Sequence, residues 1–191
     1  MKLKQTCLTA LGAAMLLIPH TAVSQLVLSF GDLSIAENST SETIEVFVTG
    51  DTNVQGVNFN IQIGDGGPIA GGSTPVQVTG VDILGGTIFE GNNTGASPGR
   101  LFVDGLALDG TTTNTGTVVA NGLLGTVTVS TTGLTAGDSF TISTNGLNGA
   151  TDFAGIAAEQ ATGTLTVVPE PASVATLALG AITLLRRRRA A

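Results

Sequence analysis

The chain repeats short runs in which apolar and polar residues alternate, and this period of two constrains the fold more than any other feature. In residues 57–63, Val, Phe, Ile and Ile alternate with Asn, Asn and Gln. Successive side chains of a β-strand point to opposite sides, so the run predicts a half-buried strand with its amides toward water. Seven other runs predict strands at residues 26–35, 44–49, 76–84, 101–108, 123–130, 139–143 and 164–168.

Clusters of Gly, Asn, Asp, Ser and Pro separate these runs, as at residues 64–68 and 92–95. Such clusters supply the backbone conformations that turns require. Short strands with no amphipathic helix between them predict an all-β fold, an antiparallel β-sandwich or jelly roll in which two sheets pack face to face. The abundant Val and Thr fit this fold because β-branched side chains pack well on a pleated surface. We expect at most one helical turn, at residues 154–161.

The first 24 residues have the pattern of a secretory signal peptide. Two lysines form a basic start, residues 7–18 form an apolar core, and Ala22 and Ser24 occupy the small positions before a predicted cleavage site at Gln25. The alternative is an apolar first helix of the fold. The apolar run at residues 7–18 is short, it is preceded by two lysines, and strand-like sequence begins soon after it. We therefore predict export and cleavage by signal peptidase.

Residues 25–168 then form one predicted domain, between a signal peptide at 1–24 and a C-terminal segment at 169–191. The domain holds thirteen of the fourteen acidic residues and one base, Arg100, which gives a formal charge of −12. A chain without clustered Lys and Arg is not expected to bind nucleic acid. The sole Cys and the sole His lie within residues 1–24. The domain is therefore predicted to use no cofactor, no Cys or His chemistry and no zinc site.

Several stretches of the middle segment resemble cohesin-like secreted β-sandwich modules. "VQGVNFNIQIGDG" resembles a strand of that family that runs into an aspartate turn, and "VQVTGVDILGGTIFEGN" resembles its following valine-rich strand. "ANGLLGTVTVSTTGLTAGDSFTIS" resembles a late strand and its hairpin. The resemblance covers about residues 26–168 and implies a β-sandwich fold. Ile63 and Gly64 stand where the family often has a tyrosine before the aspartate, which leaves the subfamily and a dockerin-binding role open.

The aspartates next to glycine are candidates for a calcium site. Asp65, Asp104 and Asp109 are each followed by Gly. Calcium prefers several carboxylate and carbonyl oxygens, but the spaced Asp-x-Asp-x-Asp-Gly pattern is absent, and Asp-Gly is common in ordinary turns. We therefore predict turns at these positions and no metal site.

The amide side chains of Asn58, Asn60 and Gln62 share one side of a predicted strand and are candidates for binding a polar ligand. We predict instead that this side faces water. The domain has no Trp or Tyr, and Phe59 and Phe140 fall at inward positions. A platform of exposed aromatic rings for sugars is therefore not expected.

Catalysis in such a domain would need a pair of carboxylates, and no pair stands out by its surroundings. We therefore predict no catalytic residue and no enzyme activity. Two alternatives remain open: a secreted carboxylate-dependent polysaccharide hydrolase, and an adhesion module for a protein partner.

The C-terminal segment joins an apolar run to a basic end. Residues 172–185 carry no charge over fourteen positions, which is about 21 Å as a helix against a hydrocarbon core of about 30 Å. Four arginines follow (Arg186, Arg187, Arg188 and Arg189) and would stay on the cytoplasmic side because Arg is costly to move through lipid. A buried core helix is the alternative, but it offers no place for four terminal arginines. We predict a transient inner-membrane anchor.

The residues before this run complete a recognisable pattern. Val168, Pro169, Glu170 and Pro171 precede the apolar run and the arginines. This order resembles the PEP-CTERM sorting signal of Gram-negative bacteria that make exopolysaccharide. The resemblance implies processing by an exosortase and delivery to the cell surface or extracellular matrix, where the domain would contact polysaccharide or a matrix protein.

Overall fold

The computed structural model describes residues 25–170, of which Gln25 and Glu170 are the two ends. The predictions for Ala22, Ser24, Pro171 and the four terminal arginines lie outside the described residues. Within the described residues, no helix is both long enough and apolar enough to span a bilayer.

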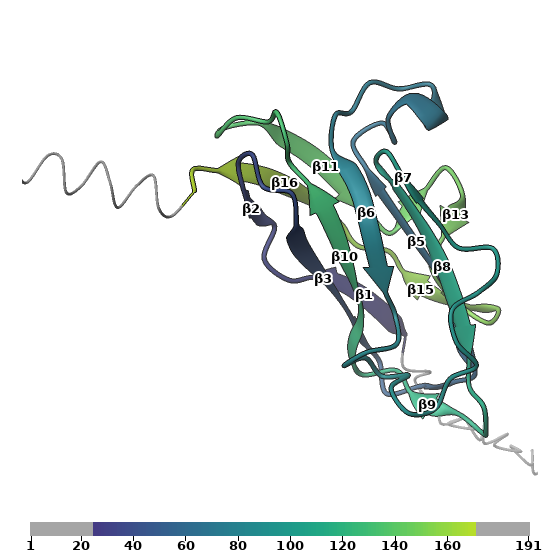
Figure 1. Ribbon diagram of the computed structural model, residues 1–191. Helices are drawn as coiled ribbons and strands as arrows, with labels where there is room; N and C mark the ends of the chain where they lie inside the picture. The colour runs from purple at the N-terminus through teal and green to yellow at the C-terminus, as the bar shows by residue number, and fades with distance from the viewer. Residues whose placement is uncertain (1–24, 171–191) are drawn as a thin grey trace, which may run out of the picture.

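Two layers of strands pack face to face around one apolar core (Figure 1). One layer contains β1 (Leu26–Phe30), β3 (Glu42–Thr49), β10 (Gly122–Ser130) and β6 (Gln77–Asp82), in that order. The other contains β2 (Ser34–Ala36), β16 (Thr162–Val168), β11 (Ser139–Ser143), β5 (Gly56–Ile63), β8 (Leu106–Thr112) and β7 (Leu101–Val103). The prediction of an all-β sandwich is confirmed.

The two layers are joined at one edge into a single mixed sheet, where the sequence predicted two separate antiparallel sheets. β14 (Asp152–Phe153) pairs with β5 and also with β15 (Ile156–Glu159). β15 then pairs in parallel with β1 of the first layer, and β2 pairs in parallel with β16. Strand alternation gives no information on the direction of a partner, because parallel pairs join segments that are distant in the chain.

Three predicted segments have a different form in the structure. Residues 26–35 are divided between β1 and β2, which lie in different layers. Residues 101–108 form the β7–β8 hairpin, with Asp104 at φ 48° in its turn. Residues 154–161, where at most one helical turn was expected, contain a turn and β15 and no helical turn. The remaining elements are short: β4 (Asn53–Val54), β9 (Val118–Val119), β12 (Asn145–Gly146), β13 (Gly149–Ala150) and a 3-10 turn, η1 (Pro68–Ala70).

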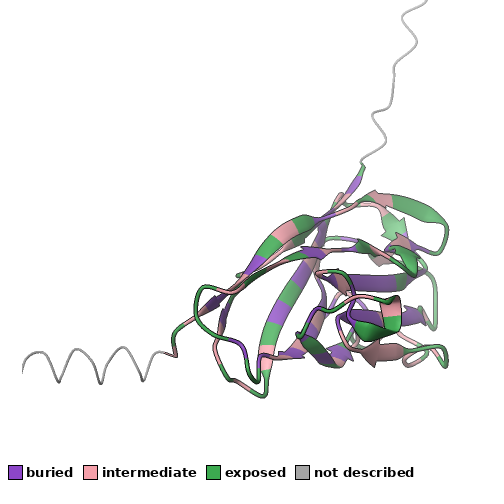
Figure 2. Cartoon of the chain, turned by 90° about the horizontal axis from the view of Figure 1, so that it is seen from above, coloured by how far each residue is buried: buried purple, intermediate pink, exposed green. Residues whose placement is uncertain are grey.

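The core lies where the alternation of β5 placed it. Val57, Phe59, Ile61 and Ile63 are at most 2% exposed, and Figure 2 shows buried and exposed residues alternating along the strands. Each such side chain contributes about 1.5–3 kcal/mol when fully buried. Phe140 is only partly buried and packs against this core.

Candidate functional site

Two of the three amide side chains of β5, Asn60 and Gln62, lie beneath a covering segment, and the prediction that the row faces water is wrong for these two. Residues directly opposite in an antiparallel pair project to the same side, so Asn58 and Asn60 share the outer side of the sheet with Gly110 and Leu108 of β8. Asn58 is exposed, but Asn60 is 4% exposed. Gln62 is half-buried and accepts a hydrogen bond at 2.7 Å from the Leu147 backbone N–H.

Residues 144–160 form this cover, and Gln160 holds it together. The Gln160 Oε1 accepts hydrogen bonds from the Thr144 hydroxyl at 3.0 Å and the Thr151 backbone N–H at 3.1 Å. Its Nε2 donates to the carbonyls of Thr151 and Ala158. Thr151 in turn exchanges two hydrogen bonds of 2.9 Å with the backbone of Asn60. One amide side chain therefore fixes the cover to the central strand.

A groove of about 520 Å³ opens between this cover and the outer side of β5 and β8. Polar side chains and small aliphatic ones both contribute to it: Asn58, Asn60, Asn148, Thr151, Asp152 and Gln160 with Leu108, Ala150, Ala157 and Ala158. A second hollow of about 270 Å³ lies between residues 94–98 and the strands β5 and β8. Asn58 lines both hollows, so they adjoin at this side chain.

The Asn60 side chain in the wall of the groove is incompletely satisfied. Its Nδ2 donates to the Ala150 carbonyl at 3.3 Å, while its buried Oδ1 accepts no hydrogen bond. A buried acceptor without a donor costs about 1–3 kcal/mol, so native folds retain few of them. Beside it, the Asn58 Nδ2 donates to Asp152 Oδ1 at 3.0 Å.

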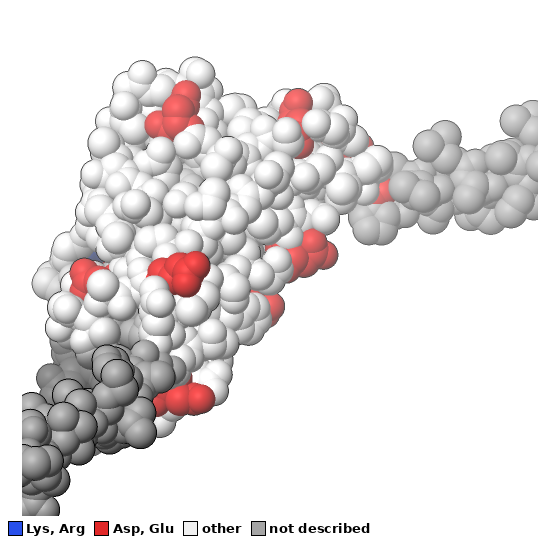
Figure 3. Space-filling model, turned by 180° about the vertical axis from the view of Figure 1, so that it is seen from behind, with Lys and Arg blue, Asp and Glu red and all other residues white. Residues whose placement is uncertain are grey.

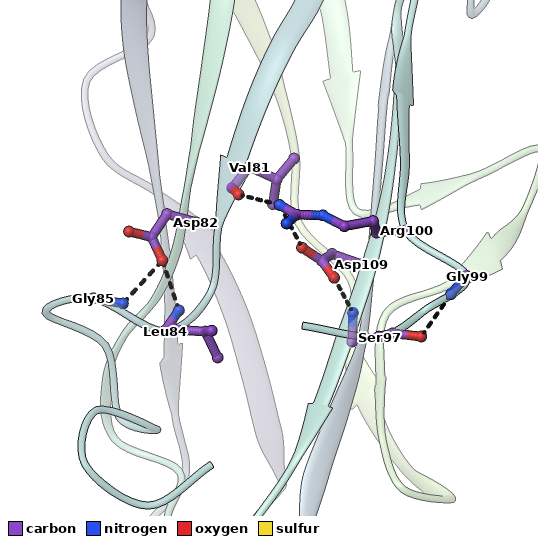
Figure 4. Close-up of polar contacts among 9 residues, drawn as sticks. Val81, Asp82, Leu84, Gly85, Ser97, Gly99, Arg100 and Asp109 are labelled. Atoms are coloured by element: carbon purple, nitrogen blue, oxygen red, sulfur yellow. Dashed lines mark hydrogen bonds and ion pairs between the residues drawn. The ribbon is translucent and has the colours of Figure 1, made fainter. Parts of the chain in front are cut away.

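The opposite side of the same strand pair carries a charged pair instead. Asp109 lies opposite Phe59 on the core side of β8, and its side chain is 1% exposed. Arg100 Nη2 lies 3.3 Å from Asp109 Oδ2 and donates to the Val81 carbonyl of β6 at 3.1 Å (Figure 4). The prediction of a turn at Asp109 is wrong, because Asp109 and Gly110 lie inside β8. The domain's only base thus neutralises a buried carboxylate where the two layers meet.

The turns predicted at Asp65 and Asp104 are confirmed. Asp65 accepts hydrogen bonds from the backbone N–H groups of Gly67, Ser73 and Thr74 at 2.7–3.0 Å. The Thr74 hydroxyl, followed by these N–H groups, holds the pKa of the Asp65 carboxyl well below its usual range. Asp104 Oδ2 accepts from the Ile69 N–H of the same loop.

These carboxylate oxygens face backbone donors, which is the opposite of what a cation requires. Within residues 25–170, no group of three or more His, Cys, Asp or Glu side chains is arranged to hold a metal ion. Acidic side chains form separate patches on the face shown in Figure 3. Among the described residues, the three Asp-Gly aspartates that were candidates for a calcium site therefore do not form a cation site.

The first residues of the C-terminal signal sit directly against the fold. Val168 is the last residue of β16, and its carbonyl accepts a hydrogen bond at 2.9 Å from the Glu37 N–H. Pro169 and Glu170 follow with no strand pairing. Figure 1 shows β16 ending at the opposite end of the sandwich from the start of β1.

Sequence reasoning missed Gln160, Thr151 and Asp152, which build the groove. These residues belong to or flank the β14–β15 hairpin, whose turn is formed by Ala154 and Gly155. Both turn residues have a positive φ, of 54° and 90°. Such two-residue turns are usually signalled by Asn-Gly or Asp-Gly. Here Ala154 occupies the position where Asn or Asp is usual, so the sequence did not indicate a hairpin turn.

Comparison with known proteins returned one family and a set of structures. Residues 167–189 match the PEP-CTERM protein-sorting motif, which implies export, exosortase processing and sorting to the cell surface. A search of curated protein sequences returned no match.

Among solved structures, the chain is similar to the cohesin module of a family 33 glycoside hydrolase from Clostridium perfringens. The two are 9% identical, with a TM-score of 0.49, over 77% of this chain and 99% of the other. It is also similar to a type III cohesin module from the cellulosomal ScaE cell-surface anchoring scaffoldin of Ruminococcus flavefaciens. That pair is 16% identical, with a TM-score of 0.45, over 70% of this chain and 72% of the other.

Proposed function

We propose that this chain is an exported, non-enzymatic β-sandwich that is displayed at the cell surface and associates there with extracellular polysaccharide. Signal peptidase would cut before Gln25. An exosortase-type enzyme would process the chain at residues 168–171, while the apolar run and the arginines hold it in the inner membrane of a Gram-negative envelope.

The observation that carries this proposal is the position of the sorting motif at the end of the last strand. The match begins at Val167, and Val168 is still hydrogen-bonded to Glu37. Processing at Pro169 or beyond would therefore leave every strand of the sandwich in place. The displayed product would be the intact domain.

The non-enzymatic part of the proposal is supported by the roles of three of the thirteen acidic side chains of the domain. Asp65 and Asp104 order a loop, and Asp109 pairs with Arg100 in the interior. A carboxylate occupied in this way is poorly placed to transfer protons to a substrate. Turnover of a polysaccharide that is abolished by one Asp or Glu substitution would contradict this part.

The sorting part is tested with two variants of the full chain in a bacterium that has an exosortase. Replacing Pro169, Glu170 and Pro171 with Ala should leave an uncut precursor in the membrane, because the extended segment offered to the protease is lost. Replacing the four terminal arginines with Ser should let the chain mislocalise, because the barrier to translocation is lower.

Fractionation and mass spectrometry read out both variants and the unaltered protein. The unaltered protein should be found with the extracellular matrix, starting at or near Gln25 and lacking residues 177–185. Identical behaviour of all three chains, with residues 177–185 still attached, would overturn the sorting proposal. A surface-recovered chain that starts at Met1 would contradict signal cleavage.

A further inference from the structure

We infer that the groove over the outer side of β5 and β8 binds a short stretch of neutral polysaccharide. This inference rests on the proposed function and identifies the ligand class and the site. Within the sandwich, the groove combines a ligand-sized hollow with polar groups and one unsatisfied buried acceptor.

The shape of the groove suits a linear polymer. Its volume of about 520 Å³ lies in the range of about 300–1,000 Å³ that is usual for ligand sites. The second hollow of about 270 Å³ adjoins it at Asn58. Successive units of one chain could therefore occupy both hollows on either side of this side chain.

The polar groups of the groove suit hydroxyl groups, which can both donate and accept hydrogen bonds. Asn58 and Asp152 stand together at the rim, bonded to each other at 3.0 Å. Asn60 Oδ1 is an acceptor that lacks a donor. This oxygen is buried in the wall of the groove beside β13, whose Ala150 carbonyl accepts a hydrogen bond from Asn60 Nδ2, so a hydroxyl would reach it by displacing β13. A sugar hydroxyl would complete the hydrogen bonding that the fold leaves open.

The walls supply apolar contact without aromatic rings. Leu108, Ala150, Ala157 and Ala158 line the groove among the polar side chains. The C–H faces of a sugar ring can pack against such small aliphatic side chains. This accounts for a sugar site in a domain that has no Trp or Tyr.

The charge of the site selects for a neutral ligand. Asp152 is the only ionisable side chain in its lining, and Arg100, the domain's one base, is committed to Asp109. An anionic polymer would meet a domain of formal charge −12 with no cation in the groove. A neutral polymer meets no such repulsion.

The test measures binding to the full chain, purified in a mild detergent, by isothermal titration calorimetry. The probes are unbranched neutral hexasaccharides of glucose, mannose and galactose, with hexagalacturonate at low salt and with chelator as the acidic probe. Ala157→Trp fills the groove from an exposed position, and Asn58→Ala removes the shared amide. Ala136→Trp is the matched control, because Ala136 is also exposed but does not line the groove.

We expect at least one neutral hexasaccharide to bind. Ala157→Trp should weaken that binding tenfold or more, and Asn58→Ala about fivefold, which is the loss expected for one hydrogen bond. Ala136→Trp should bind as the unaltered chain does. The inference is overturned if no neutral probe binds, if hexagalacturonate binds best, or if Ala157→Trp and Asn58→Ala leave the affinity unchanged.

Failure of this inference is distinct from failure of the proposed function. If both groove variants stay with the matrix as the unaltered protein does, the groove is the wrong site while surface display in the matrix stands. If the unaltered protein is absent from the matrix, the proposed function itself fails.

Discussion

The β5–β8 strand pair carries a polar cluster on each side, and the buried polar side chain of each cluster is accommodated in a different way. On the core side, Asp109 is charged and is neutralised by Arg100. On the outer side, Asn60 is uncharged and is covered by residues 144–160, with one oxygen left without a donor. Each side leaves one buried oxygen without a hydrogen-bond donor, Asp109 Oδ2 on the core side and Asn60 Oδ1 on the outer side. The difference is that Asn60 lines a groove with room for a ligand, whereas Asp109 faces the Arg100 side chain.

The largest effect is expected from breaking the charged pair. Arg100→Met leaves the Asp109 carboxylate buried without its charge partner, with only the Gly110 N–H still donating to it, and should lower the free energy of unfolding by about 3 kcal/mol. This is the low end for a broken buried pair, because the Arg100 side chain is 43% exposed. Urea denaturation measures the loss.

The double variant Arg100→Met/Asp109→Asn is the control for this effect. Removing the second charge should restore most of the lost stability, because an amide is far less costly to bury than a carboxylate. Equal stability of Arg100→Met and the unaltered protein would mean that the pair is not effectively buried.

The second effect concerns the cover on the outer side. Gln160→Leu removes four hydrogen bonds that join residues 144, 151 and 158 of the cover, so we expect a loss of about 2 kcal/mol in the free energy of unfolding. Gln55→Leu, at an exposed amide between β4 and β5, should change stability little. Equal losses in the two variants would show that Gln160 does not fix the cover.

A smaller effect of opposite sign is expected at the turn of the cover. Ala154 has φ 54°, a left-handed conformation that costs a residue with a Cβ about 1 kcal/mol and that Asn tolerates better. Ala154→Asn should therefore raise the melting temperature. Ala154→Val should lower it, since β-branched residues are poorest in this conformation. The reverse order would mean that the turn differs from the one described.

The smallest effect belongs to Asp65, which is exposed at the end of β5. Its pKa is lowered in the folded state, so the ionised group stabilises the fold fully above the ordinary Asp pKa of about 3.9, and this contribution is lost as the pH falls toward the lowered value. Asp65→Asn should melt below the unaltered protein at pH 7, with a gap that narrows in acid. The exposed Glu90→Gln serves as the control, and a gap that widens in acid would contradict the assignment.

The fold was predictable from local sequence because alternation decides to which side each side chain points. Phe59 and Ile61 were placed in the core by their positions in the run, and both are buried. The turn at Asp104 was predictable for a similar reason, since Asp-Gly favours that backbone. The candidate site was predictable only in part: Asn58 and Asn60 were identified as one row, but their environment was predicted wrongly.

The sequence by itself determined the long strands, most of the core, the absence of Lys from the domain and the sorting motif at residues 167–189. These depend on neighbouring residues or on simple counts. Only the tertiary structure decided that Asp109 meets Arg100 inside the sandwich and that a groove forms over Asn60. The hydrogen bond between Asn60 and Thr151 joins residues 91 positions apart, and no local pattern specifies which distant segment will cover an exposed row of amides.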